Sequence, residues 1–313
     1  MPGVVAVTAS LGRAPLLARL LASLGTEQPA LTRAVVVDNA DSAATAAVVR
    51  SAALPVERLV PGRNLGCGGG VARGLQTALA DPAMSHVCIL DDDAYVTPGA
   101  VPAMLKAMVT AGADAAVPLV ADGAGRIGWF PGPLGQPAWN VIRRAGITPT
   151  EFRAQCGDTL LAWNWAPWTV LLVTRRAIEA VGPPRDDFWF QGEDLEWTLR
   201  LTARFRGVLA PGALCRHEPP PAPDETSARV RVWLKQCAML QNNAYTVTRL
   251  PHGRRARRHL PGNVWRFVSR ARFTPAAWRD AIHALWLGAV QGLPAGAPRG
   301  GPWARRWTAA NLA

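Results

Sequence analysis

Three adjacent aspartates, Asp91, Asp92 and Asp93, offer the plainest chemistry in this sequence. They follow the apolar run VCIL, which is typical of a buried strand. Adjacent carboxylates repel one another, so a folded chain holds them together only beside a cation or strong hydrogen-bond donors. Oxygen ligands of this kind suit Mg²⁺ or Mn²⁺, which bridge protein carboxylates and substrate phosphates. A solvated turn before a helix that starts at Pro98 is the alternative interpretation.

A second acidic group, Glu193-Asp194-Leu195-Glu196, lies between the aromatic FWF and the expected helix WTLRLTARF. A carboxylate in such a place could accept a proton from a hydroxyl group. Acidic residues at a helix start are also favoured simply by the helix dipole, and both interpretations stay open. His217 follows a predicted strand in CRHEP, where a single histidine is more often structural or exposed than a ligand.

Two further segments could contact a ligand. The run Gly66-Cys67-Gly68-Gly69-Gly70 permits close backbone approach and precedes a helix N-terminus, which favours anions. It fits neither the dinucleotide-binding nor the P-loop pattern, and a tight helix–sheet contact explains it equally. In WNWAPW (163–168), the faces of Trp163 and Trp165 could stack on sugar rings, or pack in the core beside the apolar run TVLLV.

The elements that must position these residues alternate between strand and helix. Apolar runs predict strands at 4–10, 34–41, 57–62, 86–96 and 207–219, and helices at 14–24 and 98–112. Three further segments combine two elements: a glycine-rich loop enters a helix at 64–80, a strand is followed by a helix at 169–182, and an acidic turn enters a helix at 188–205. Residues 117–165 are expected to form an ordered, irregular loop. Alternation predicts an α/β fold with a mostly parallel sheet, whose strand ends gather Asp38, Asn64 and the three aspartates at one rim.

Composition restricts the class of protein. With 49% hydrophobic and 18% charged residues in 313, the chain can bury a real core. Its five cysteines are scattered and never spaced CxxC, which argues against a zinc ribbon or a disulfide framework. The first residues carry no signal-peptide pattern, and no apolar run is long enough to span a bilayer. We expect a cytoplasmic protein.

The net charge of +12 belongs to the C-terminal part, since 15 Lys or Arg residues and one acid, Asp280, lie between Arg229 and Ala313. The dense run of Arg254, Arg255, Arg257 and Arg258, with tryptophans nearby, suits a helix lying on the anionic inner face of the cell membrane. A basic helical appendage that packs on the core is the other interpretation. Nucleic-acid binding is not expected, because no recognition motif accompanies the arginines.

Taken in order, these pieces resemble the inverting family-2 glycosyltransferases of GT-A fold, and most of all the bacterial galactofuranosyl- and rhamnosyltransferases. The matching segments are VTAS (7–10), VVVDNAD (35–41), NLGCGGGVARGL (64–75), ILDDDAYVTPGAV (89–101), FQGEDLEWTLRL (190–201) and APGALCRHEP (210–219). The opening VTASLGR departs from the family's threonine-x-asparagine-arginine pattern, and whether Arg13 replaces that arginine stays open.

The resemblance implies a Rossmann-like catalytic domain at 1–222 and a basic, mainly helical region at 223–313. It implies a donor site with Thr8 and Asp38 at the base, Asn64 and Gly66 at the nucleotide, and Asp92 near the ribose or sugar. It also implies that Asp91, Asp93 and His217 hold Mn²⁺ or Mg²⁺ against the diphosphate.

On the acceptor side, the resemblance implies that Asp194 is the general base, with Glu193 beside it, and that Trp163 and Trp165 form an acceptor platform. The expected reaction moves a sugar from a UDP- or dTDP-sugar, such as galactofuranose or rhamnose, to a hydroxyl of a glycan, glycolipid or small molecule with inversion. A Mg²⁺-dependent nucleotidyltransferase and a nucleic-acid-binding protein acting through the basic tail are the alternatives.

Overall fold

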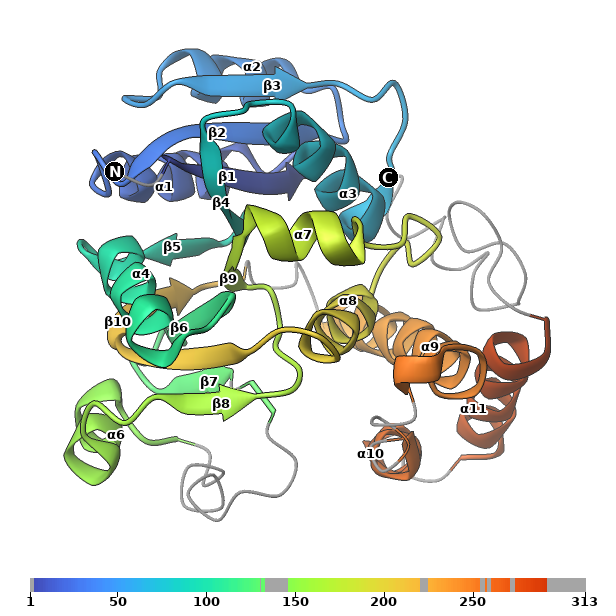
Figure 1. The fold of residues 1–313 in the computed structure, drawn as a ribbon. Coiled ribbons are helices and arrows are strands. Elements are labelled where there is room, and N and C mark those ends of the chain that lie inside the picture. The colour runs from blue at the N-terminus through green and yellow to red at the C-terminus, as the bar shows by residue number, and fades with distance from the viewer. Residues whose placement is uncertain are drawn as a thin grey trace. The chain divides into compact units, whose positions relative to one another are not determined.

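The computed structural model describes residues 3–129, 131–132, 146–219, 225–253, 257, 260–270 and 274–291 (Figure 1). Contacts within the chain group into two compact units. The first comprises Met1–Asn64, Gly70–Pro183 and Arg200–Pro220, and the second comprises Leu65–Gly69, Pro184–Leu199 and Pro221–Ala313. The functional division expected after residue 222 stays a prediction.

The first unit contains a ten-stranded sheet in the order β3-β2-β1-β4-β9-β6-β10-β5, with β7 on β6 and β8 on β10. The strands are β1 (Gly3–Ser10), β2 (Leu31–Asp38), β3 (Val56–Leu59), β4 (Met84–Asp91), β5 (Ala94–Val96), β6 (Ala115–Ala121), β7 (Ile127–Trp129), β8 (Leu161–Trp163), β9 (Val170–Thr174) and β10 (Gly207–His217). β3, β2, β1 and β4 are parallel, β9 is antiparallel to β4 and β6, and β10 is parallel to β6. The predicted α/β fold is confirmed.

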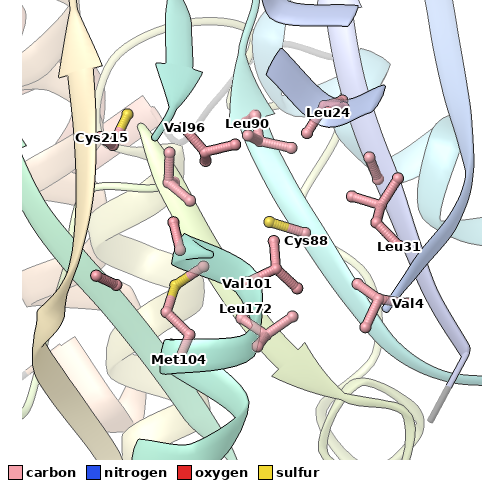
Figure 2. Packing of buried hydrophobic residues seen from close by; sticks show 14 of the residues in the cluster. Val4, Leu24, Leu31, Cys88, Leu90, Val96, Val101, Met104, Leu172 and Cys215 are labelled. Carbon is pink, nitrogen blue, oxygen red and sulfur yellow. The ribbon is translucent and has the colours of Figure 1, made fainter. Parts of the chain in front are cut away.

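Apolar side chains explain why these segments form the core. β1 and β2 bury both of their faces, as strands covered on two sides do. Helix α1 (Ala14–Gly25) buries Leu17, Leu20, Leu21 and Leu24, which recur at helical spacing. Figure 2 shows side chains of β1, β4, β9 and β10 meeting those of α1 and α4 (Ala100–Ala111) in one cluster.

Two segments differ from the sequence expectation. The strand expected at 86–96 breaks at Asp92 and Asp93, so the acidic turn lies between β4 and β5. The region 117–165, expected to be an irregular loop, contains most of β6, β7, helix α6 (Pro149–Cys156) and β8. Pro118 obscured β6, because proline is normally excluded from a strand interior. It is tolerated opposite Ala210, where the register of β10 shifts before Leu214.

The remaining helices of the first unit connect its strands. They are α2 (Ala43–Arg50), α7 (Arg175–Val181) and most of α3 (Gly66–Leu79). Helix α3 packs directly on β1, because a Cβ atom added to Gly70 would lie 2.6 Å from the Cβ of Ala9, and one added to Gly74 would clash with Val7. Two of the glycines in this region therefore serve helix–sheet packing.

The second unit contains α9 (Glu225–Arg249), α10 (Leu260–Arg270), α11 (Pro275–Trp286), the π-turn η2 (Leu287–Gln291) and the start of α8 (Glu193–Thr202). Its core joins residues of α9, α10 and α11, among them Leu240, Phe267 and Ala281. Of the basic run, only Arg257 belongs to the described residues. No helix in the described part of the chain is long and apolar enough to cross a bilayer.

Candidate functional site

Two strand ends of the first unit bring two carboxylates and an imidazole together. Asp91 ends β4, Asp93 follows it in the turn to β5, and His217 ends β10. β10 pairs with β5 so that His217 lies opposite Ala94, the residue after Asp93. One ligand atom from each of Asp91, Asp93 and His217 lies within 4.8 Å of the others. Asp93 Oδ1 and His217 Nε2 are 3.0 Å apart.

The middle aspartate of the turn has different partners. Asp92 is buried, and its Oδ2 accepts a hydrogen bond of 2.7 Å from the hydroxyl of Ser10. The guanidinium of Arg13 forms ion pairs of 2.6 Å with Asp92 and 2.8 Å with Asp93. Ser10 was not among the predicted site residues, and the sequence left open whether Arg13 replaces the arginine of the family's pattern. The guanidinium of Arg13 thus neutralises part of the negative charge of the acidic turn.

Burial and charge set the protonation of this group of side chains. Burial raises the pKa of Asp92 to about 6, against the opposing effects of Arg13 and Ser10. For Asp93, burial acts upward, but the hydrogen bond from His217 and the charge of Arg13 outweigh it and lower the pKa. For His217, burial acts downward, but the hydrogen bond and charge of Asp93 raise the pKa.

The donor set fits a divalent cation. Carboxylate oxygens suit Mg²⁺ and Mn²⁺, and an imidazole nitrogen is a common additional ligand for transition metals. Three carboxylates face one guanidinium here, so the turn keeps negative charge that a cation can neutralise. Asp91 is half-buried, whereas Asp93 and His217 are largely buried, which leaves one ligand accessible to solvent.

A polar network fixes the chain directly after His217. The carboxylate of Glu218 accepts hydrogen bonds of 2.6 Å from the Tyr95 hydroxyl and 2.9 Å from Arg19. The Arg19 guanidinium carbon lies 4.4 Å from the centroid of the Tyr95 ring. The backbone N–H of Glu218 donates to the carbonyl of Asp93, at 3.1 Å. These contacts tie the end of β10 to the acidic turn.

The residues expected at the nucleotide lie in or after other strands of the first unit. Asp38 ends β2 fully buried, and its carboxylate accepts from Arg58 at 2.7 Å and from the N–H of Ser42 at 3.0 Å. Thr8 lies within β1, and its buried hydroxyl has no hydrogen-bond partner among the described residues. Asn64 is half-buried between β3 and α3. Their roles at the nucleotide stay predictions.

The glycine run differs in shape from the expectation. Helix α3 already begins at Gly66, so the following glycines lie in its first turns and not in a preceding loop. Gly66 belongs to the second unit and has a φ of 73°. A Cβ atom there would overlap the carbonyl oxygen of Trp189 and lie 2.6 Å from its ring. The positive φ and this close contact both require glycine, and a role at the nucleotide stays a prediction.

Asp194 and Glu193 are the first residues of α8 and belong to the second unit. Burial raises the pKa of Asp194 to about 6, although its Oδ1 accepts a hydrogen bond of 2.7 Å from the N–H of Leu195. Glu193 is buried. A carboxylate that titrates near neutral pH is suited to general-base chemistry, because it can take a proton and release it again.

The turn before α8 is anchored by α9. The side-chain amide of Asn242 donates to the carbonyls of Phe190, at 3.1 Å, and Gln191, at 2.6 Å. Gln191 has a φ of 66°, a conformation that a non-glycine residue adopts only when neighbouring contacts impose it. Further along α8, the imidazole of His252 lies 3.0 Å from the carboxylate of buried Glu196. Asp194 therefore lies on a tightly held segment.

The two tryptophans expected at the acceptor lie in the first unit. Trp163 is buried in β8 and covers Gly207 of β10, where a Cβ atom would overlap its ring. That contact is core packing, which was one of the two interpretations of the tryptophan cluster. Trp165 is half-buried, and its carbonyl accepts a hydrogen bond of 2.8 Å from the N–H of Gly132. A role in binding the acceptor stays a prediction for both.

The sequence and the fold were compared with those of known proteins. Residues 5–157 match the sequence model of "Glycosyl transferase family 2". No curated protein matches the chain. Among solved structures, the chain is similar to S. aureus TarS 1-349 (TM-score 0.54, 14% identity, covering 93% of this chain and 82% of that one).

A second TarS structure, in complex with UDP-GlcNAc, gives a TM-score of 0.59 at 14% identity, over 94% of this chain and 82% of that one. The mannosyltransferase PcManGT from Pyrobaculum calidifontis, in complex with GDP-Man and Mn²⁺, gives 0.55 at 18% identity, over 99% and 84%. At these identities the likeness to solved structures concerns the fold.

Proposed function

Because the chain belongs to glycosyl transferase family 2, we propose that it moves a sugar from a nucleoside-diphosphate donor to an acceptor hydroxyl with inversion at the anomeric carbon. The observation that carries this proposal is the cluster of Asp91, Asp93 and His217 at the ends of β4 and β10. Parallel strands end there, which is where α/β proteins bind their ligands.

On the donor side, Asp91, Asp93 and His217 would hold Mn²⁺ or Mg²⁺. Such an ion, when bound, neutralises the negative charge that develops on the departing nucleoside diphosphate. The ion pairs of Arg13 with Asp92 and Asp93 fix the acidic turn, so that its carboxylates do not rearrange as a ligand arrives. Thr8, Asp38 and Asn64 would line the nucleotide pocket.

On the acceptor side, Asp194 would be the general base, with Glu193 beside it. The acceptor oxygen forms a bond to the anomeric carbon while the bond from that carbon to the diphosphate oxygen breaks, and Asp194 takes the hydroxyl proton. Its raised pKa supports this role, because a more basic carboxylate takes the hydroxyl proton more readily than an ordinary aspartate. Trp163 and Trp165 would contribute to the acceptor site.

A binding experiment with four candidate donors identifies the sugar nucleotide. The resemblance favours UDP-galactofuranose and dTDP-rhamnose, while the similar structures were solved with UDP-GlcNAc and with GDP-Man and Mn²⁺. A thermal-shift panel of these four donors, each with and without Mn²⁺, identifies the base, since a ligand that binds only the folded chain raises its melting temperature. We expect one donor to stabilise the protein, and more strongly with Mn²⁺.

Turnover of that donor then tests the reaction. The proposed transfer releases a nucleoside diphosphate, whereas a nucleotidyltransferase acting on a sugar phosphate and a nucleoside triphosphate releases pyrophosphate. The charge-neutral variants Asp91→Asn and Asp93→Asn should lose the Mn²⁺-dependent part of the shift. The variant Asp122→Asn, in an exposed turn of the first unit, is the matched control. Pyrophosphate release, or no shift with any of the four donors, would contradict the proposal.

A further inference from the structure

Helix α11 exposes its largest side chains and buries its smallest. The side chains that it packs into the second unit include Ala277, Ala281 and Ala284, each fully buried. The large apolar side chains that it exposes are Trp278 (41%), Ile282 (61%) and Trp286 (45%). A helix whose only task is to cover a core has the opposite arrangement, with large apolar residues inside and polar residues outside. The exposed face of α11 therefore needs another explanation.

The exposed residues form one continuous stripe. They recur every fourth residue along α11, and the series continues into η2 with Val290, which is 56% exposed. Residues four apart lie one above the other on a helix, so the four side chains share one face. We call Trp278, Ile282, Trp286 and Val290 the α11 stripe. A contiguous apolar surface of this kind marks a site of interaction.

The charges around the stripe are of one sign. The described side chains between Trp233 and Gln291 include exposed Lys235, Arg249, Arg257, Arg266 and Arg279. The one acid in that range, Asp280, is buried and accepts a hydrogen bond of 3.0 Å from Trp233 Nε1. Its other oxygen lies 3.3 Å from Arg279. Between Trp233 and Val290, the described residues thus present positive charge and no exposed carboxylate.

We propose that the α11 stripe lies on the surface of an anionic lipid bilayer, with its indole rings at the level of the headgroups. Tryptophan suits that depth because its ring is apolar and its N–H can still reach water or a headgroup. Arg279 on the same helix, and Arg249, which donates to the carbonyls of Ala289 and Val290, are exposed and supply attraction to anionic lipid. A second copy of the chain fits less well, because two surfaces of the same positive charge repel each other. The inference concerns a surface and does not depend on the proposed transfer reaction.

Flotation of the full chain with vesicles tests this inference. We expect binding to vesicles of mixed phosphatidylcholine and phosphatidylglycerol, weak binding to phosphatidylcholine alone, and release as the salt concentration rises. The triple variant Trp278→Ser, Ile282→Ser, Trp286→Ser should weaken binding about tenfold or more, because each substitution removes apolar area from the contact. Val109→Ser, which changes a highly exposed apolar residue on α4, is the control and should bind as the parent does.

The charge contribution is tested separately. Arg266→Gln and Arg279→Gln should each reduce the affinity for anionic vesicles about fivefold, which corresponds to ~1 kcal/mol per charge. Circular dichroism establishes that each variant is folded. The inference is overturned if the triple variant binds vesicles like the parent. It is also overturned if the parent ignores both kinds of vesicle while sedimentation velocity shows self-association that the triple variant loses, which would assign the stripe to a second copy.

Discussion

The guanidinium of Arg13 lies 2.6 Å from the carboxylate of Asp92, whose side chain is fully buried. Adjacent carboxylates need a nearby cation, and the protein supplies one of its own here. The three aspartates therefore divide their tasks. Asp92 contacts only Ser10 and Arg13 in this cluster, whereas Asp93, which also pairs with Arg13, lies with Asp91 beside His217. Asp92 therefore supports the turn, whereas Asp91 and Asp93 belong to the proposed metal site.

Removing Arg13 should destabilise the fold. In Arg13→Ala, the buried carboxylate of Asp92 loses its cation and must either stay charged or take up a proton, which we expect to cost about 1–2 kcal/mol. Urea unfolding at neutral pH measures the loss. Arg73→Ala, which removes an exposed arginine from α3, should change the free energy of unfolding by less than about 0.5 kcal/mol. Equal stability of the two variants would contradict the support role of Arg13.

Metal removal gives a second prediction. Chelation by EDTA should stop donor turnover, and Mn²⁺ or Mg²⁺ should restore it. In Asp93→Asn and His217→Ala, we expect the Mn²⁺ concentration for half-maximal activity to rise about tenfold or more, because each variant removes one ligand of three. Asp122→Asn should respond to Mn²⁺ as the parent does. Turnover that is indifferent to EDTA would remove the metal from the proposal.

The sequence predicted most of the fold because its apolar runs are regular. The runs that became β1, α1 and β2 carry their burial pattern in the residue order itself. The sequence did not predict β6, because this strand contains Pro118 and proline is in general an unfavourable strand residue. Only its pairing with the bulged part of β10 makes it acceptable, and that pairing joins residues 92 positions apart. A local pattern carries no signal of such a contact.

A variant of the proposed base separates chemistry from binding. Asp194→Asn keeps the size of the side chain but cannot take a proton, so transfer should fall about 10²–10⁴-fold. The thermal shift with donor and Mn²⁺ should stay close to that of the parent. Asp186→Asn makes the same change at an exposed position of the second unit and should retain activity. Full activity of Asp194→Asn would exclude this residue as the base.

The candidate site was predictable in part for the same physical reason. Asp91 ends a strand, and the strand ends of an α/β sheet gather at one edge, so its type and place were enough to single it out. His217 also ends a strand, but its role as a ligand was predicted only from the family resemblance. Ser10 was missed and the role of Arg13 was left open, because what these two side chains contact depends on the order of the strands in the sheet. β1 pairs with β4 so that Ala9 lies opposite Asp91, which brings the residues after Ala9 beside the acidic turn. Nothing in the run VTASLGR indicates which strand is its neighbour.

The raised pKa of Asp194 gives a pH prediction. A general base acts in its ionised form, so burial that raises the pKa to about 6 moves the loss of activity upward from the ordinary range of an aspartate. We expect kcat to fall as the pH drops through about 6 and to level off above it. The residual activity of Asp194→Asn should lack this limb. A parent profile that stays flat down to pH about 4.5 would contradict the assignment.

Two glycines in helices should respond to alanine with opposite signs. Alanine favours a helix interior over glycine by about 1 kcal/mol, so Gly262→Ala in α10, where a Cβ atom meets nothing within 4 Å, should stabilise the protein. In Gly74→Ala, the added Cβ atom would clash with Val7 Cγ1, so α3 must move away from β1 or Val7 must change its rotamer. Such overpacking costs about 1–3 kcal/mol, which exceeds the gain in helix propensity. Urea unfolding of both variants measures the two effects, and a Gly74→Ala variant as stable as the parent would show that α3 and β1 are packed less closely than the structure has them.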